Sequence, residues 1–243
     1  MDEVYVSWQN PESRIWHIVG RLQRKENSYI FNYTKGVEKD SIFQPFSGME
    51  NLESEYHSEN LFPFFSNRIL SSKRPEYKEY IRWLGLNENN ADPLKILTRS
   101  EGTRGTDSYQ VIKKFSWDSD GKFKHSFFSH GLRHFHSSTK ELIVNSNIGD
   151  KVFLCLDKQN SFDKDAVLIR MDNPKHLIGY VPKFLSSCIS TIIENENNSI
   201  HAIIKNISKD APLAYLLRCE VSGVISTETK EILNNYLQEF EAL

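Results

Sequence analysis

The second half of the chain repeats one local pattern, in which a short run rich in β-branched and aromatic residues ends at a polar turn signal. Short strands at such close spacing are typical of small barrels. The pattern therefore predicts a small β-barrel for this half. The expected strands span residues 124–133, 151–156, 165–170, 177–181, 201–206 and 213–221.

Two helices are expected to interrupt the barrel, over residues 182–195 and 227–240. Ser226 or Thr227 can cap the second, because a hydroxyl oxygen at that position accepts a hydrogen bond from a free backbone amide. The turn signal at residues 118–121 precedes all of these elements and is the expected domain boundary.

The first half has a different texture. A polar turn at residues 10–13 joins the first two of its expected strands into a hairpin, and a stretch with apolar residues at helical spacing follows the third. The fold class is α+β: an N-terminal antiparallel sheet with helices in domain 1–118, and a β-barrel with two helices in domain 119–243. Strands are expected at residues 4–8, 15–22, 28–33 and 109–115, and helices at 61–70, 76–84 and 93–98.

Charge limits the kind of partner. A net charge of −2 and a pI near 6.5 argue against a protein that coats duplex DNA by bulk electrostatics. Between Lys122 and Lys183, however, ten Lys or Arg residues stand against six Asp or Glu. A nucleic-acid site would therefore be local and would lie in the second half.

Cysteine usage and the N-terminus point to a soluble cytoplasmic protein. Cys155, Cys188 and Cys219 are far apart, which indicates buried thiols and neither a disulfide framework nor a zinc knuckle. The first residues lack a basic start followed by an apolar run, and no stretch of about eighteen apolar residues occurs.

The most informative motif is Asn160-Ser161-Phe162-Asp163-Lys164-Asp165-Ala166-Val167, followed by Ile178-Gly179-Tyr180-Val181-Pro182-Lys183. The first piece predicts a tight polar turn that enters a buried strand, because Asn160 and Asp163 can bond backbone amides two residues on. The second predicts a strand in which Gly179 permits close backbone approach, and a helix that starts after Pro182.

These two segments resemble the Asn-Pro-(Tyr/Phe)-Asp-x-Asn-Ala-(Ile/Val) turn and the Ile/Val-Gly strand-to-helix step of HIRAN domains. A third segment, Gly131-Leu132-Arg133-His134-Phe135, resembles the family's first barrel strand. The resemblance covers roughly the second half of the chain. It implies an OB-like barrel that binds single-stranded DNA and, in some relatives, a free 3′-hydroxyl.

Carried over by position, the resemblance implies that Arg133 meets a phosphate and that Phe162 and His134 sandwich a base. Asp163 would accept the hydroxyl proton. The implied DNA-binding residues are Arg133, His134, Phe135, Asn160, Phe162, Asp163, Lys164, Tyr180 and Lys183.

Some positions depart from the family pattern. His134 stands where a phenol is common, Phe162 lacks a tyrosine hydroxyl, and a second aromatic clamp has no counterpart in residues 217–221. The rings of His134 and Phe162 can still stack on a base, but neither offers the hydroxyl hydrogen bond of a tyrosine. A purely structural alternative stays open, in which Asn160 and Asp163 only close a barrel corner and Gly179 only permits packing.

The first half resembles the N-terminal subdomain of HipA-type toxin kinases, on residues 4–8, 19–22, 61–70 and 83–86. In those kinases this subdomain sits beside the catalytic core, and free-standing copies regulate the kinase. The chain has no phosphate-binding loop, catalytic loop or metal-binding Asp-Phe-Gly, so phosphoryl transfer is not expected.

No other catalytic or metal constellation stands out. His125, His130, His134 and His136 cluster, and a strand would place the last two on one face, but no Cys or carboxylate follows at zinc-ligand spacing. We therefore expect no cofactor, no metal and no enzymatic activity. The sequence predicts a single-stranded DNA-binding protein with an N-terminal partner-binding domain; the alternative is an antitoxin-like protein that regulates a separate HipA-type kinase.

Overall fold

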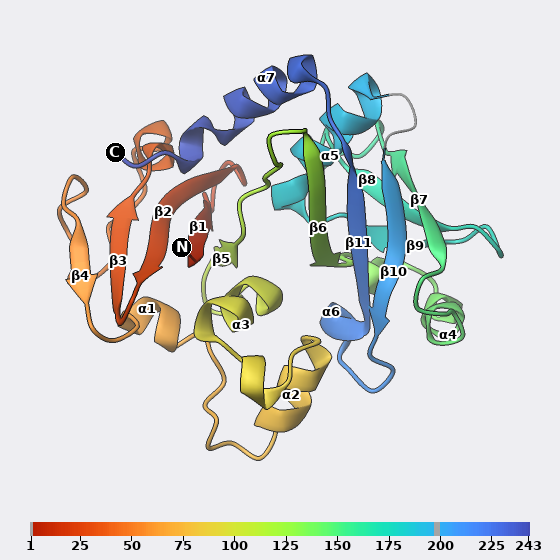
Figure 1. Cartoon of the computed structure of the whole chain (residues 1–243), viewed down its shortest axis with the longest axis horizontal. Helices are drawn as coiled ribbons and strands as arrows, with labels where there is room; N and C mark the ends of the chain where they lie inside the picture. The colour runs from red at the N-terminus through yellow and green to blue at the C-terminus, as the bar shows by residue number, and fades with distance from the viewer. Residues whose placement is uncertain (1, 197–199) are drawn as a thin grey trace. The chain divides into compact units, whose positions relative to one another are not determined.

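The computed structural model describes residues 2–196 and 200–243, which form two compact units with one antiparallel sheet in each (Figure 1). One unit comprises the chain up to Lys114 together with Leu237–Leu243, and the other comprises Phe115–Tyr236. The chain first passes from one unit to the other after Lys114, close to the boundary expected near residue 118. The expected C-terminal domain ran to residue 243, whereas residues 237–243 belong to the first unit.

The sheet of the first unit has five strands in the order β4-β3-β2-β1-β5. The expected hairpin is present, with Val4 paired to Leu22, and a bulge in its second strand places the extra residue Val19 opposite Val6 and Ser7. The fourth strand was not foreseen from the sequence. The bounds are β1 Asp2–Gln9, β2 Trp16–Lys25, β3 Ser28–Tyr33, β4 Tyr56–Ser58 and β5 Tyr109–Ile112.

One expected helix of this unit is much shorter than predicted. The apolar run at residues 61–70 forms a single α-helical turn, after which the Arg68 and Ile69 amides bond to carbonyls three residues back, and the Arg68 guanidinium contacts the Asp107 carboxylate at 2.6 Å. Phe65 still packs into the core. The helices are α1 Pro63–Ser66, α2 Tyr77–Trp83 and α3 Pro93–Ser100, with 3-10 turns η1 Lys35–Lys39 and η2 Glu88–Asn90.

The C-terminal residues complete the first unit through η4, Leu237–Phe240. The Phe240 ring packs edge-on to Tyr5 with ring centroids 4.8 Å apart, and Ala242 forms a β-bridge with Thr34. The Glu239 carboxylate accepts a hydrogen bond of 3.1 Å from the Ile18 amide. This short segment therefore joins the unit by apolar packing and by backbone hydrogen bonds.

The second unit has six strands in the order β6-β11-β10-β7-β8-β9. The sheet curls until its two ends meet, because His130, beyond the end of β6, exchanges two hydrogen bonds of 2.9 Å with Tyr180 of β9. This curled antiparallel sheet is consistent with the expected barrel. The bounds are β6 Lys122–Phe128, β7 Lys151–Leu156, β8 Val167–Met171, β9 Leu177–Tyr180, β10 His201–Ile207 and β11 Leu217–Val224.

The helices of this unit bring both agreement and correction. The two expected helices are present, whereas residues 131–135, predicted as a strand, form a 3-10 turn, and residues 213–216 form a helical turn before β11. Helix α4 was not foreseen. The bounds are η3 Leu132–His134, α4 Ser138–Val144, α5 Lys183–Asn195, α6 Leu213–Leu216 and α7 Thr227–Tyr236.

The three cysteines are unpaired, and Cys188 and Cys219 are buried as expected, while Cys155 is half-buried. Burial raises the pKa of the Cys188 and Cys219 thiols to about 12. Within residues 2–196 and 200–243, no helix combines the length and the apolar composition needed to span a bilayer.

Candidate nucleic-acid interface

The Gly131 turn places two side chains of the candidate site on the surface. Gly131 has a φ of 74° and leads the chain from the His130 bridge into η3, where Leu132 is buried and Arg133 and His134 are exposed. A Cβ atom on Gly131 would lie 3.2 Å from the Tyr180 ring. The turn therefore lies directly against Tyr180, and the missing side chain permits this approach.

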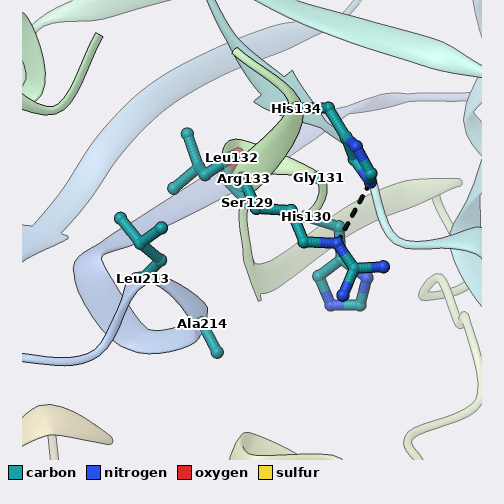
Figure 2. Close-up of a pocket in the computed structure, with 8 residues that line it drawn as sticks. All are labelled: Ser129, His130, Gly131, Leu132, Arg133, His134, Leu213 and Ala214. Atoms are coloured by element: carbon teal, nitrogen blue, oxygen red, sulfur yellow. Dashed lines mark hydrogen bonds between the residues drawn. The ribbon is translucent and has the colours of Figure 1, made fainter. Parts of the chain in front are cut away.

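A cavity of about 270 Å³ opens beside this turn (Figure 2). Figure 2 shows the Arg133 side chain next to the His134 ring, and the Arg133 Nε donates a hydrogen bond of 3.1 Å to His134 Nε2. The arrangement combines a cation and a flat ring with an apolar wall. The lining residues are Ser129, His130, Gly131, Leu132, Arg133, His134, Leu213 and Ala214.

The second part of the site is the turn between β7 and β8. The Asn160 side-chain oxygen accepts hydrogen bonds of 3.0 Å from the amides of Phe162 and Asp163, and Asp163 Oδ1 accepts one of 3.0 Å from the Asp165 amide. These bonds confirm the turn-making roles expected of Asn160 and Asp163. They hold the backbone so that the Phe162 side chain projects outward, where the residue is 96 % exposed.

Tyr180 links the two turns. Its hydroxyl donates a hydrogen bond of 3.0 Å to Asp157 Oδ2, which also accepts one of 3.0 Å from the Asn160 side-chain amide. The Phe135 ring lies 5.9 Å from the Tyr180 ring, centroid to centroid. Burial, and then the neighbouring Asp157 carboxylate, raise the pKa of the Tyr180 hydroxyl, so the phenol keeps its proton.

Lys183, at the start of α5, forms an ion pair with the Asp163 carboxylate. Lys164 is exposed on the same turn. Gly179 has a φ of 115°, and a Cβ atom there would lie 2.7 Å from the His130 carbonyl oxygen, which confirms the close backbone approach expected at this position.

The structure brings most of the predicted residues into small connected groups. Phe135, Tyr180 and Asn160 meet through Tyr180 and Asp157, Arg133 contacts His134, and Asp163 contacts Lys183. The sandwiching of a base between Phe162 and His134 stays a prediction. Sequence reasoning missed Asp157, because its role depends on a contact with β9 and not on the local turn pattern.

The histidine cluster differs from the expected arrangement. His134 lies in a 3-10 turn and not on a strand, and His136 Nδ1 is 2.8 Å from the Ser138 hydroxyl oxygen, so the shared strand face predicted for these two rings does not form. Among the described residues, no group of three or more His, Cys, Asp or Glu side chains is placed to hold a metal ion.

Comparison with known proteins identifies the second unit. Residues 122–228 match the model of the HIRAN domain family, so this part of the chain is a HIRAN domain. The HipA-type likeness of the first unit receives no support from the comparisons. No curated protein sequence matches the chain at a significant level.

Two solved structures are similar to this chain at low identity. One is the HIRAN domain of human HLTF, with 18% identity, a TM-score of 0.36, and coverage of 51% of this chain and 93% of that one. The other is a protein from Lactobacillus plantarum, with 13% identity, a TM-score of 0.35, and coverage of 44% of this chain and 100% of that one.

Proposed function

We propose that the HIRAN domain holds the end of a single strand of DNA and that the protein is a binding module without catalytic activity of its own. The observation that carries the proposal is the exposure of Phe162. Its ring is 96 % exposed at the tip of a turn that is fixed by hydrogen bonds from the backbone to Asn160. A flat apolar ring held in solvent by a rigid turn is a ready stacking surface for a base.

The purely structural explanation of this turn accounts for Asn160 and Asp163 but not for Phe162. The turn is closed by side-chain oxygens of Asn160 and Asp163. The phenyl ring adds little to that closure, because a residue this exposed buries almost no apolar surface. A small polar residue at position 162 would make the same turn, so the ring is better explained by a ligand.

The charged groups of the site could bind the phosphate and the 3′-hydroxyl at the end of a DNA strand. Arg133 is exposed beside the cavity, where its guanidinium can meet a phosphate, and Lys183 partly neutralises Asp163. A 3′-hydroxyl can donate a hydrogen bond to the Asp163 carboxylate, whereas a 3′-phosphate would be repelled by it. We therefore propose that the site prefers a free 3′ end.

The test is binding of fluorescent oligothymidine of about four nucleotides, close to the smallest site sizes of small barrels, to the full chain at low salt. We expect Phe162→Ala to weaken binding roughly 5- to 150-fold, since a stacked base contributes about 1–3 kcal/mol. Arg133→Ala should also weaken binding, because it removes the proposed contact with a phosphate. A strand with a 3′-phosphate should bind more weakly than one with a 3′-hydroxyl.

Matched controls separate the site from general effects. Ile148→Ala removes another exposed apolar side chain, 66% exposed, and Arg74→Ala removes an exposed cation from the first unit. Both should bind like the wild type. Wild-type protein that binds no single strand, or site variants that bind as well as the controls, would overturn the proposal.

The antitoxin-like alternative depends on the sequence resemblance of the first unit alone. Co-purification of a kinase with the full chain, together with no affinity for any single strand at low salt, would favour it.

A further inference from the structure

A band of cations crosses the outer face of the HIRAN sheet, outside the candidate site. In an antiparallel sheet, directly paired residues and residues two apart on one strand point to the same face. Arg170 of β8 is paired with Phe153 of β7, so these two side chains share a face. Lys151 lies two residues before Phe153 on β7 and therefore points to the same face. Lys151 is paired with Ile203 of β10, which in turn is paired with Glu220 of β11, so the same face continues across the sheet.

At one end of this face an aromatic ring holds two cations. The Lys151 ammonium lies 4.6 Å and the Arg170 guanidinium carbon 4.5 Å from the centre of the Phe153 ring. Within the part of the chain that the structure describes, neither cation has a carboxylate partner. Contact with the ring fixes the two side chains in place while leaving their charge available to an anion.

At the other end two lysines share one carboxylate. Glu220 lies 3.0 Å from the Lys124 ammonium and 3.2 Å from the Lys205 ammonium, and it accepts a hydrogen bond of 3.1 Å from Ser126. Burial alone would raise the pKa of the Glu220 carboxyl, but these hydrogen bonds outweigh it and lower the pKa. One negative charge therefore offsets only part of the positive charge.

We call Lys124, Lys151, Arg170 and Lys205 the basic band. Lys124 and Lys205 share the Glu220 carboxylate, whereas Lys151 and Arg170 lie against the Phe153 ring, so among the described contacts four positive charges meet one negative charge in a chain whose net charge is −2. From β8 to β6 the band crosses four strand spacings, roughly 19 Å. That is long enough to meet several phosphates of an extended strand.

The basic band begins next to the candidate site. Tyr180 is paired with Leu168 of β8, and Arg170 lies two residues further along β8, beyond a register shift in the β8–β9 pairing. Arg170 therefore lies about 7 Å along β8 from the residue that is paired with Tyr180. Tyr180 is the residue that links the two turns of the site. A strand that leaves the site past Tyr180 therefore meets Arg170 first.

We propose that the basic band is a second phosphate-binding surface, along which a single strand of DNA held at the candidate site continues across the sheet. The inference rests on the proposed function for the position of the strand's end. The band contacts phosphates and not bases, so it contributes affinity without sequence preference, and that contribution depends strongly on salt.

The experiment compares oligothymidine of about 4 and about 15 nucleotides, lengths that bracket the site sizes of small barrels, on the full chain over a range of salt. For the double variant Lys151→Gln with Arg170→Gln we expect roughly tenfold weaker binding of the long strand, and a salt dependence reduced by about 1.4 in the slope, for two lost contacts. Binding of the short strand should weaken less than binding of the long strand, because a strand of about four nucleotides held at the candidate site reaches Arg170 but not the whole basic band.

A variant of opposite sign guards against a folding defect. Glu220→Gln removes the carboxylate that occupies Lys124 and Lys205, so the long strand should bind more tightly and with a steeper salt dependence. The matched control, Arg74→Gln with Lys95→Gln, removes the same charge from exposed positions of the first unit and should leave both affinities unchanged.

The outcomes separate this inference from the proposed function. If the double variant binds the long strand as tightly as the control does, the basic band does not bind DNA. Binding of the short strand would in that case still support binding of a DNA end at the candidate site. If the wild type binds only the long strand and the double variant binds neither strand, the result contradicts binding of a DNA end at the candidate site and supports binding of phosphates by the basic band.

Discussion

Gly179 is the residue on which closure of the HIRAN sheet depends most directly. Its φ of 115° lies in a region that side chains rarely adopt, and an added Cβ atom would lie 1.9 Å from the Ser129 hydroxyl oxygen and 2.7 Å from the His130 carbonyl oxygen. His130 is the residue that bridges to Tyr180. A side chain at position 179 would thus push apart the two ends of the sheet.

We expect Gly179→Ala to lower the free energy of unfolding by roughly 3 kcal/mol or more, because strain and a backbone clash add together. The matched control is Gly149→Ala, at a φ of 94° with open space around the new Cβ atom, where strain alone should cost about 1–2 kcal/mol. Urea unfolding of both variants checks the difference, and equal losses would contradict the clash.

Single residues also show where sequence reasoning holds and where it stops. The turn-making roles of Asn160 and Asp163 were predictable, because their partners are amides within three residues. The role of Asp157 was not, since its partner Tyr180 is 23 residues away. The resemblance gave Phe162 a base-stacking role, which requires an exposed ring, and the structure shows the residue 96 % exposed although aromatic residues are buried more often than not.

At the scale of elements, the elements best predicted are those with local start and stop signals. Helix α7 is an example: the Ser226 hydroxyl accepts a hydrogen bond of 3.2 Å from the Thr229 amide, as the capping pattern predicts. The structure adds Glu196, whose carboxylate accepts one of 2.6 Å from the Ser226 amide. Burial would raise the pKa of Glu196, but the hydrogen bonds from Thr229 and Ser226 outweigh it and lower the pKa.

This geometry gives a prediction with a defined pH dependence. Ser226→Ala should cost about 1 kcal/mol, or about 2–4 °C in Tm, by removing the cap. Glu196→Gln should also lower Tm at neutral pH. Because the folded-state pKa lies below the ordinary value of 4.5, the stabilisation from Glu196 is complete above that pH and is lost as the pH falls through the folded-state value.

Thermal unfolding of wild type and Glu196→Gln between neutral pH and about pH 3 tests this sign, since the ordinary range of carboxyl titration lies within it. The two Tm values should differ at neutral pH and converge below pH 4.5. A difference that grows on acidification would contradict the assigned hydrogen bonds.

Elements were mispredicted where apolar residues pack without regular structure. Residues 131–135 were expected to form a strand because they resemble the first barrel strand of HIRAN domains, yet Gly131 turns the chain into η3 directly after the His130 bridge. Residues 61–70 have helical periodicity, yet the helix ends after one turn, and Arg68 directly beyond it contacts Asp107, which lies 39 residues further along the chain. In both cases a tertiary contact overrides the local pattern.

At the scale of the whole molecule, the chain passes between the two units twice, after Lys114 and again after Tyr236. The last residues give the first unit a buried Phe240, a bridge from Ala242 to Thr34 and a hydrogen bond of 3.0 Å from the Lys35 amide to the Glu241 carbonyl oxygen. The first unit is therefore completed only when the end of the chain is present.

We expect a chain ending at Tyr236 to lose roughly 3–5 kcal/mol of stability in the first unit. Leu237 and Phe240 are buried there, and burial of each side chain stabilises the fold by about 1.5–3 kcal/mol. Hydrogen exchange of the β1–β3 amides measures the loss. Amides of β7 and β8 and affinity for short oligothymidine should be unchanged. Faster exchange spread evenly over both units would contradict the assignment of these residues to the first.

The sequence by itself determined the two halves, most strands, the long helices and the motif that marks residues 122–228 as a HIRAN domain. These features are encoded in local spacing and in turn chemistry, which act over a few residues. Only the tertiary structure decided the closure of the sheet at His130 and Tyr180, the partner of Arg68, the return of the C-terminus and the alignment of the basic band. Each of these joins residues far apart in the chain, and such contacts depend on how whole elements pack together.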